Sequence, residues 1–192
     1  MEPRLKTQFN ETTLTHLKDE FSLENPMAFP KIEKVILNVG MGRQLEGTKL
    51  NAKAKAQVLE DLTVISGQKP VMLKAKRSVS NFKLRTGYEI GAMVTLRGNQ
   101  MWEFLDRLIQ VAIPRIKDFR GLRDSSFDPR GSYAFGVNEQ GIFPEVDMTS
   151  CDFIHGMNIQ IIFKNSSKAK SIFVLKDLGI PFEKKEDKKR RR

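Results

Sequence analysis

The spacing of apolar residues separates helices from strands along this chain of 192 residues. Over residues 3–24, 49–66 and 100–113, apolar side chains recur every three or four positions, which is typical of amphipathic helices. A fourth helix is predicted over 166–179, between two serines and Gly179. Short runs rich in apolar and β-branched residues predict strands over 31–42, 69–75, 88–98, 132–137 and 155–163.

The predicted order is α β α β β α β β α, in which several strands follow one another directly. Such an order favours an α+β fold, with an antiparallel or mixed sheet and helices mainly on one face. The other face of the sheet is then open to a partner. The length is that of one domain, which we place at 1–182. The charged segment 183–192 is predicted to be a disordered basic tail.

The chain is strongly basic, and the excess of positive charge is confined to two segments. Lys and Arg number 33 against 23 Asp and Glu, a net charge of +10. Residues 62–88 contain six basic residues and no acid, and residues 183–192 contain seven basic and three acidic residues. These two segments account for the whole excess. Basic charge that is focused in this way favours a nucleic acid as partner.

The segment "LKAKRSVSNFKLRTGY", residues 73–88, combines cations with hydrogen-bonding and aromatic side chains. Its candidate binding residues are Lys74, Lys76, Arg77, Ser78, Ser80, Asn81, Phe82, Lys83 and Arg85. Cations neutralise phosphates, and hydroxyls and amides donate to phosphate or ribose oxygens. An exposed aromatic ring stacks on a base. The pattern predicts a basic, RNA-binding loop between two strands, while Phe82 either stacks on RNA or packs into the core.

No motif indicates catalysis, a cofactor or a metal site. Gly40 and Gly42 follow a strand, but the third glycine of a dinucleotide-binding turn is missing. The single cysteine, Cys151, precedes His155 by four residues, and we expect a small packed side chain there rather than a nucleophile or metal ligand. The acids near 139–147 are predicted to be solvated. We therefore expect a non-enzymatic protein with no cofactor, no small-molecule substrate and no membrane-spanning segment.

Several stretches together resemble one known family. They are "NPMAFPKIEKVILNVGMG", "ISGQKPVMLKAKRSVSNFKLRTGYEIGAMVTLRG", "MWEFLDRLIQVAIPRIKDFRGL", "GIFPE" and "HGMNIQIIF". In this order they resemble the bacterial-type large-subunit ribosomal protein that binds 5S rRNA, over about residues 25–182. The resemblance implies a structural protein of the central protuberance. It also implies contacts with 23S rRNA, the P-site tRNA, neighbouring large-subunit proteins and a small-subunit head protein across an intersubunit bridge.

The resemblance also implies roles for individual positions. The 5S rRNA surface would contain Asn38, Gly40, Gln68, Lys69, Thr95 and Arg97. The basic loop from Lys74 to Arg85 would reach the tRNA. The segment "FDPRGSY" resembles the loop that faces the small subunit, with Asp128, Arg130 and Tyr133 as candidates. Two positions depart from the family pattern: Pro129 stands where glycine is usual, and Gly141 where a bulky apolar residue is common.

The function expected from the sequence is that of a structural, RNA-binding ribosomal protein in the cytoplasm. The first ten residues lack the apolar core of a signal peptide, which agrees with that location. The alternative is a free-standing RNA-binding regulator or ribosome assembly factor that uses the same basic face. The two hypotheses predict different sedimentation: a ribosomal protein sediments with the large subunit, whereas a regulator or assembly factor stays largely free.

Overall fold

The computed structural model describes residues 2–42, 45–46, 49–82, 84–149 and 151–183. Its α-helices are α1 (Arg4–Gln8), α2 (Leu14–Phe21), α3 (Ala52–Ser66), α4 (Gly98–Arg107) and α5 (Lys168–Asp177). Its strands are β1 (Lys31–Gly40), β2 (Leu45–Glu46), β3 (Lys49–Leu50), β4 (Val71–Lys74), β5 (Glu89–Leu96), β6 (Tyr133–Val137) and β7 (Met157–Lys164). The predicted tail falls almost wholly on residues 184–192, outside the described ranges.

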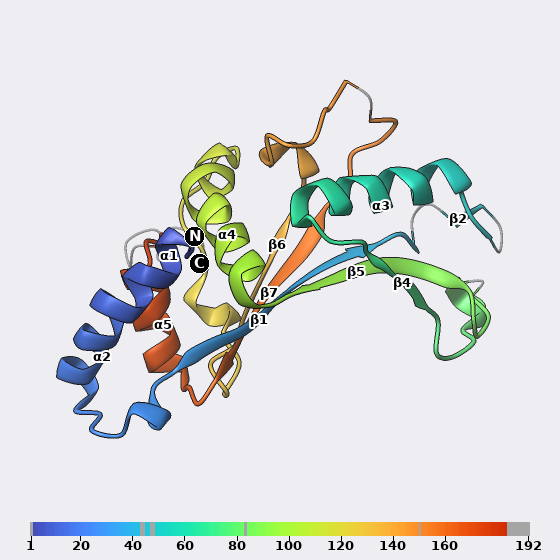
Figure 1. The fold of residues 1–192 in the computed structure, drawn as a ribbon. Helices are drawn as coiled ribbons and strands as arrows, with labels where there is room; N and C mark the ends of the chain where they lie inside the picture. The colour runs from blue at the N-terminus through green and yellow to red at the C-terminus, as the bar shows by residue number, and fades with distance from the viewer. Residues whose placement is uncertain (1, 43–44, 47–48, 83, 150, 184–192) are drawn as a thin grey trace. The chain divides into compact units, whose positions relative to one another are not determined.

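Five strands form one open antiparallel sheet in the order β4-β5-β1-β7-β6 (Figure 1). The predicted α+β class is therefore confirmed. The small pair β2-β3 was not predicted, because two-residue strands leave too few positions for an alternation to be recognised. The chain divides into two compact units: unit 1 contains 1–35, 96–135 and 160–192, and unit 2 contains 36–95 and 136–159. The prediction of one domain over 1–182 stays a prediction.

Unit 1 contains the helices α1, α2, α4 and α5. The predicted helix over 3–24 is interrupted at Phe9–Thr13 by a π-helical turn, and the fully buried Thr13 hydroxyl there donates to the Asp177 carboxylate of α5 at 2.5 Å. The predicted helix over 100–113 likewise passes into a π turn at Leu108–Ala112 and then into a short 3-10 turn containing Pro114. Both departures are local changes of helix type that apolar spacing alone does not reveal.

Unit 2 contains α3 and one half of the sheet. Helix α3 begins at Asn51, whose side chain accepts hydrogen bonds from the N–H groups of Lys53 and Ala54, and ends at Gly67 with φ +67°. Both caps follow ordinary helix chemistry. The apolar stripe of α3 is buried and comprises Ala54, Val58, Leu62 and Ile65. In Figure 1, α3 runs along one side of the strands of this unit, so one face of these strands packs against it.

Burial alternates along the strands of unit 2, as expected for a sheet with one covered face. On β1, Leu37 and Val39 are fully buried, whereas Asn38 between them is partly exposed. On β5, Ala92 and Val94 are buried on the covered side. The register pairs the 61%-exposed Val71 of β4 with Met93 of β5. The uncovered face of unit 2, which we call the open face, is thus continuous over several strands.

Candidate nucleic-acid interface

The open face of unit 2 carries short, uncharged polar side chains. Asn38 and the exposed Gly40 lie on β1, Thr95 lies on β5, and Asn158 lies on β7. Each of these side chains alternates with a buried apolar neighbour. Amides and hydroxyls of this kind donate to and accept from phosphate oxygens, ribose hydroxyls and base edges.

A hollow of about 540 Å³ lies in unit 2 and joins the strands to two loops. The predicted site residues Asn38 and Gly40 both line it, so the structure brings them together. Its lining is completed by Met41, Gly42, Gly136, Val137, Asn138, Phe153, Ile154, His155, Gly156, Met157 and Asn158. We call this feature the asparagine hollow, because Asn38, Asn138 and Asn158 supply its side-chain amides.

The other predicted 5S rRNA contacts lie elsewhere. Gln68 and Lys69 are exposed in the turn between α3 and β4. That turn is fixed by the Ser66 hydroxyl, which accepts from the Gln68 N–H at 3.2 Å. Arg97 belongs to unit 1, where it is exposed at the position preceding α4. The roles of these three residues in binding 5S rRNA stay predictions.

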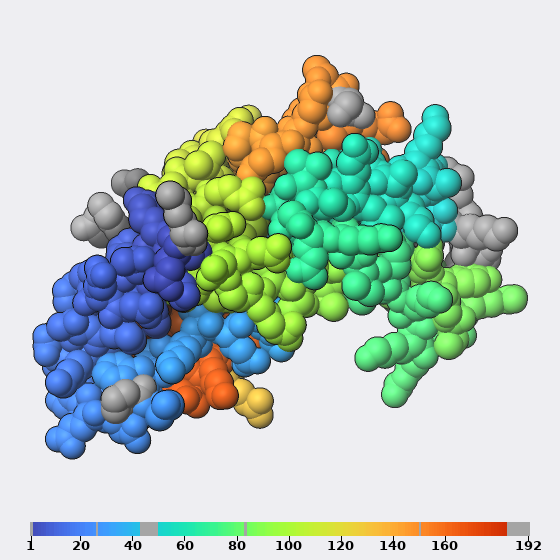
Figure 2. All heavy atoms as spheres, in the orientation of Figure 1, coloured from blue at the N-terminus to red at the C-terminus, as the bar shows by residue number. Residues whose placement is uncertain are grey.

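The basic loop, residues 74–85, connects β4 to β5 and extends from the rest of unit 2 (Figure 2). Its base is closed by hydrogen bonds between Ala75 and the segment Gly87–Tyr88. Further out, the Ser78 hydroxyl accepts from the Thr86 N–H at 3.0 Å, and Val79 pairs with Leu84. The described residues of the two arms of the loop are therefore paired with each other, and the 3-10 turn Ser80–Phe82 follows the first arm.

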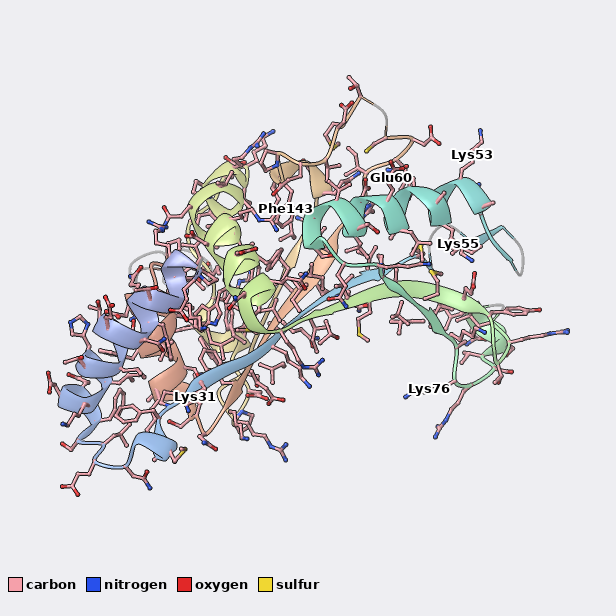
Figure 3. All side chains as sticks on the ribbon, in the orientation of Figure 1. Lys31, Lys53, Lys55, Glu60, Lys76 and Phe143 are labelled. Atoms are coloured by element: carbon pink, nitrogen blue, oxygen red, sulfur yellow. The ribbon has the colours of Figure 1, made fainter. Side chains whose placement is uncertain are left out.

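The side chains of this loop are presented outward. All of its predicted binding residues that the structure describes are exposed: Lys74, Lys76, Arg77, Ser78, Ser80, Asn81, Phe82 and Arg85. Figure 3 shows the side chain of Lys76 on this loop, pointing away from the strands. Lys83 lies outside the described residues. The Phe82 ring is 69% exposed, so it does not pack into the core and is available to stack.

The predicted intersubunit loop lies in unit 1. Asp128 and Arg130 are exposed, and the Asp128 carboxylate accepts from the Ser132 N–H at 2.6 Å. Tyr133, in contrast, is only 1% exposed, and its hydroxyl donates to the Arg123 carbonyl at 3.0 Å. Burial raises the pKa of this phenol well above its usual value. Tyr133 therefore supports the loop from the core, while contact of the loop with a small subunit stays a prediction.

The residues considered for catalysis or metal binding are engaged in structural contacts. The Cys151 thiol donates to the Asp147 carbonyl at 3.3 Å. His155 Nε2 lies 2.9 Å from the Asp61 carboxylate of α3, and both side chains are buried. Within the described ranges, no group of three or more His, Cys, Asp or Glu side chains is arranged to hold a metal ion. No helix there has the length and apolar character to cross a bilayer.

Sequence reasoning missed several residues of the asparagine hollow. Asn138, Asn158 and Gly156 line it together with Asn38, yet they come from a different part of the chain. The alternation Met157, Asn158, Ile159 on β7 does place Asn158 opposite the core. What the sequence did not provide was the adjacency of β1 and β7 in the sheet, which brings the two asparagines to one surface.

Comparison with known proteins agrees with the resemblance described above. A family model described as ribosomal protein L5 matches residues 25–85, and one described as the ribosomal L5P family C-terminus matches residues 89–182. The large ribosomal subunit protein uL5 of Corynebacterium diphtheriae is 50% identical over 182 residues, which is 95% of either chain. The uL5 protein of Kocuria rhizophila is 46% identical over 94% of this chain and 93% of its own.

A more divergent relative gives the same result. The uL5 protein of Symbiobacterium thermophilum is 44% identical over 93% of this chain and 97% of its own. The matched family is one of structural ribosomal proteins and not of enzymes, so the prediction of a non-enzymatic protein is confirmed. Two family models that together cover most of the chain, and relatives that match nearly its full length, establish that this chain belongs to the ribosomal protein L5 family.

Proposed function

We propose that this ribosomal protein is a constituent of the large subunit that binds 5S rRNA with the open face of unit 2 and helps to attach it in the central protuberance. The observation that carries the proposal is the uncovered sheet face with its row of small polar groups, including Asn38, Gly40, Thr95 and Asn158. An RNA backbone can approach such a surface closely where its side chains are short, and these polar groups offer it hydrogen bonds.

The basic loop is assigned to a second RNA, the P-site tRNA. It extends from unit 2 and lacks any acid. A carboxylate in the loop would repel the phosphates that its lysines and arginines neutralise. The exposed Phe82 beside these cations offers a stacking surface for an unpaired base. Charge and shape therefore both suit a loop that reaches an RNA beyond the one bound by the sheet.

The remaining contacts are proposed from family membership together with exposure. The loop with Asp128 and Arg130 is exposed in unit 1 and is assigned to a small-subunit head protein. Exposed cations such as Arg115 suit 23S rRNA, since phosphate contacts require no particular sequence. We also propose neighbouring proteins of the large subunit as binding partners.

The test uses the full chain in cells and in a purified mixture. A tagged copy should sediment almost wholly with the large subunit in a lysate gradient, and the purified protein should form a complex with 5S rRNA alone. A protein that stays mainly in the free fraction would point to a regulator or an assembly factor. A protein that sediments with the subunit but does not bind isolated 5S rRNA would disprove the assignment of the open face.

A further inference from the structure

The asparagine hollow differs from the basic loop in its chemistry. Among the residues that the structure describes, its lining contains three side-chain amides, four glycines, His155 and several apolar groups, but no lysine, arginine, aspartate or glutamate. This described lining offers a phosphate no lysine or arginine. A nucleobase, in contrast, is flat and neutral, and carries donors and acceptors on its edges. The volume of about 540 Å³ lies within the roughly 300–1,000 Å³ of sites that enclose small ligands.

Two glycines of the hollow are not required by the fold. A methyl group built on Gly40 or Gly42 has no atom of the described residues within 4 Å apart from its chain neighbours, and neither residue has a positive φ. The other glycines of the described chain either have a positive φ or would bring the added carbon close to another group. Folding therefore tolerates a side chain at positions 40 and 42. A side chain there would instead occupy the space above the backbone, where a ligand would approach.

One wall of the hollow is held rigidly in place. The segment 152–155 is fixed by Gln57, whose amide donates to the Phe153 carbonyl at 2.8 Å and accepts from the Asp152 N–H. It is also fixed by the fully buried Gln140, which donates to the same carbonyl and accepts from the His155 N–H. Four side-chain hydrogen bonds thus hold this short loop. A ligand that binds to a loop held in this way does not have to order it, so the binding free energy is not reduced by that entropic cost.

An apolar side chain is presented within this wall. Ile154 is 61% exposed although its neighbours in the segment are tied down. A large aliphatic group that is exposed beside amides offers a surface against which the face of a base packs, while the amides contact its edge. The hollow therefore combines the two elements of base recognition, an apolar face and hydrogen-bonding side chains.

We propose that the asparagine hollow accepts one unpaired nucleobase of the bound RNA. The base packs against Ile154, and its edge forms hydrogen bonds with amides from the set Asn38, Asn138 and Asn158. This inference rests on the proposed binding of 5S rRNA and adds a base-specific contact to it. A duplex backbone lying across the sheet would not enter the hollow, because its bases are stacked and paired. The ligand is therefore a base from a loop or a bulge.

The experiment probes 5S rRNA with base-specific reagents, dimethyl sulfate and a carbodiimide, and with hydroxyl radicals for the backbone. The wild-type protein should protect the pairing edge of at least one unpaired base. Gly40→Val adds a branched side chain whose Cβ has no described atom within 4 Å, and it should abolish that protection and weaken binding at least tenfold. Backbone protection elsewhere should remain at higher protein concentration. The matched control is Thr63→Val, at an exposed position of α3. It should change neither the base protection nor the affinity.

Asn158→Ala provides a second variant should Gly40→Val fail to fold. Asn158 is exposed, so its truncation leaves no buried group unpaired, and the same base should regain reactivity. Backbone protection by the wild type with no base protected would overturn the inference and leave the proposed function intact. Base protection that persists in both variants would also overturn the inference, because the protected base would then be bound outside the hollow. Absence of any footprint would refute the proposed function itself.

Discussion

Replacing Gln140 with alanine should destabilise unit 2 much more than a loop glutamine normally would. Gln140 is 0% exposed. Its amide nitrogen donates to the Phe153 carbonyl at 3.0 Å, and its amide oxygen accepts from the His155 N–H at 2.8 Å. The Phe153 carbonyl keeps a second donor, Gln57, at 2.8 Å. The His155 N–H loses its side-chain acceptor in a buried position.

The magnitude follows from these contacts. A buried donor left without a partner costs about 1–3 kcal/mol, and a lost hydrogen bond whose acceptor keeps another partner costs about 0.5–1.5 kcal/mol. The variant Gln140→Ala should therefore lose about 2–4 kcal/mol of unfolding free energy. Urea denaturation followed by circular dichroism should show a lower midpoint with an unchanged slope. Hydrogen exchange should show faster exchange of the amides in 152–156.

Gln57→Ala is the matched control, because Gln57 makes two similar hydrogen bonds to the same segment. Its partner Asp152 is exposed, so water can replace the lost acceptor, and Phe153 keeps Gln140. We expect a loss below about 1 kcal/mol. Equal losses in the two variants, or a larger loss for Gln57→Ala, would contradict this reasoning. They would show that burial of the unpaired His155 N–H does not determine the loss of unfolding free energy.

Two further predictions concern the sheet and the basic loop. Gly91→Ala should lower the free energy of unfolding in urea by about 1–3 kcal/mol, because the added carbon would lie 2.7 Å from a carbonyl oxygen of β1. The control Gly40→Ala, whose added carbon has no described atom within 4 Å, should be close to neutral. A larger loss for Gly40→Ala than for Gly91→Ala would contradict the packing described here. Changing Lys74, Lys76 and Arg77 together to alanine should leave the affinity for 5S rRNA mostly intact in a filter-binding assay, yet weaken P-site tRNA binding to ribosomes carrying the variant and flatten its salt dependence. A large loss of 5S affinity would refute the division between loop and sheet.

Local chemistry made most of the fold predictable. Gly67 ends α3 with a positive φ, as its place after an apolar helix indicated. The run of apolar and β-branched residues around Asn38 predicted a strand, and the structure has that strand. These features depend on neighbours in sequence. The π turns at Phe9–Thr13 and Leu108–Ala112 were missed because they change the helix type without changing which residues are apolar.

The candidate site was predictable only in part, for a related reason. Asn38 and Gly40 were assigned to an RNA surface through resemblance, but their partners Asn138, Asn158 and Ile154 were not. Those residues reach the hollow through strand order and through the bonds of Gln57 and Gln140, both long-range features. Phe82 was ambiguous because a sequence does not give burial. Its exposure of 69% removes the core alternative.

The central claim, that the open face of unit 2 binds 5S rRNA, is tested most directly by the affinity of single amide variants for isolated 5S rRNA. Asn38→Ala and Asn158→Ala, both on the open face, should each weaken binding by about 1–3 kcal/mol, or roughly 5- to 150-fold. Thr63→Ala, an exposed position on α3, should bind like the wild type. Unchanged affinity in both amide variants, or an equal loss in Thr63→Ala, would contradict the claim.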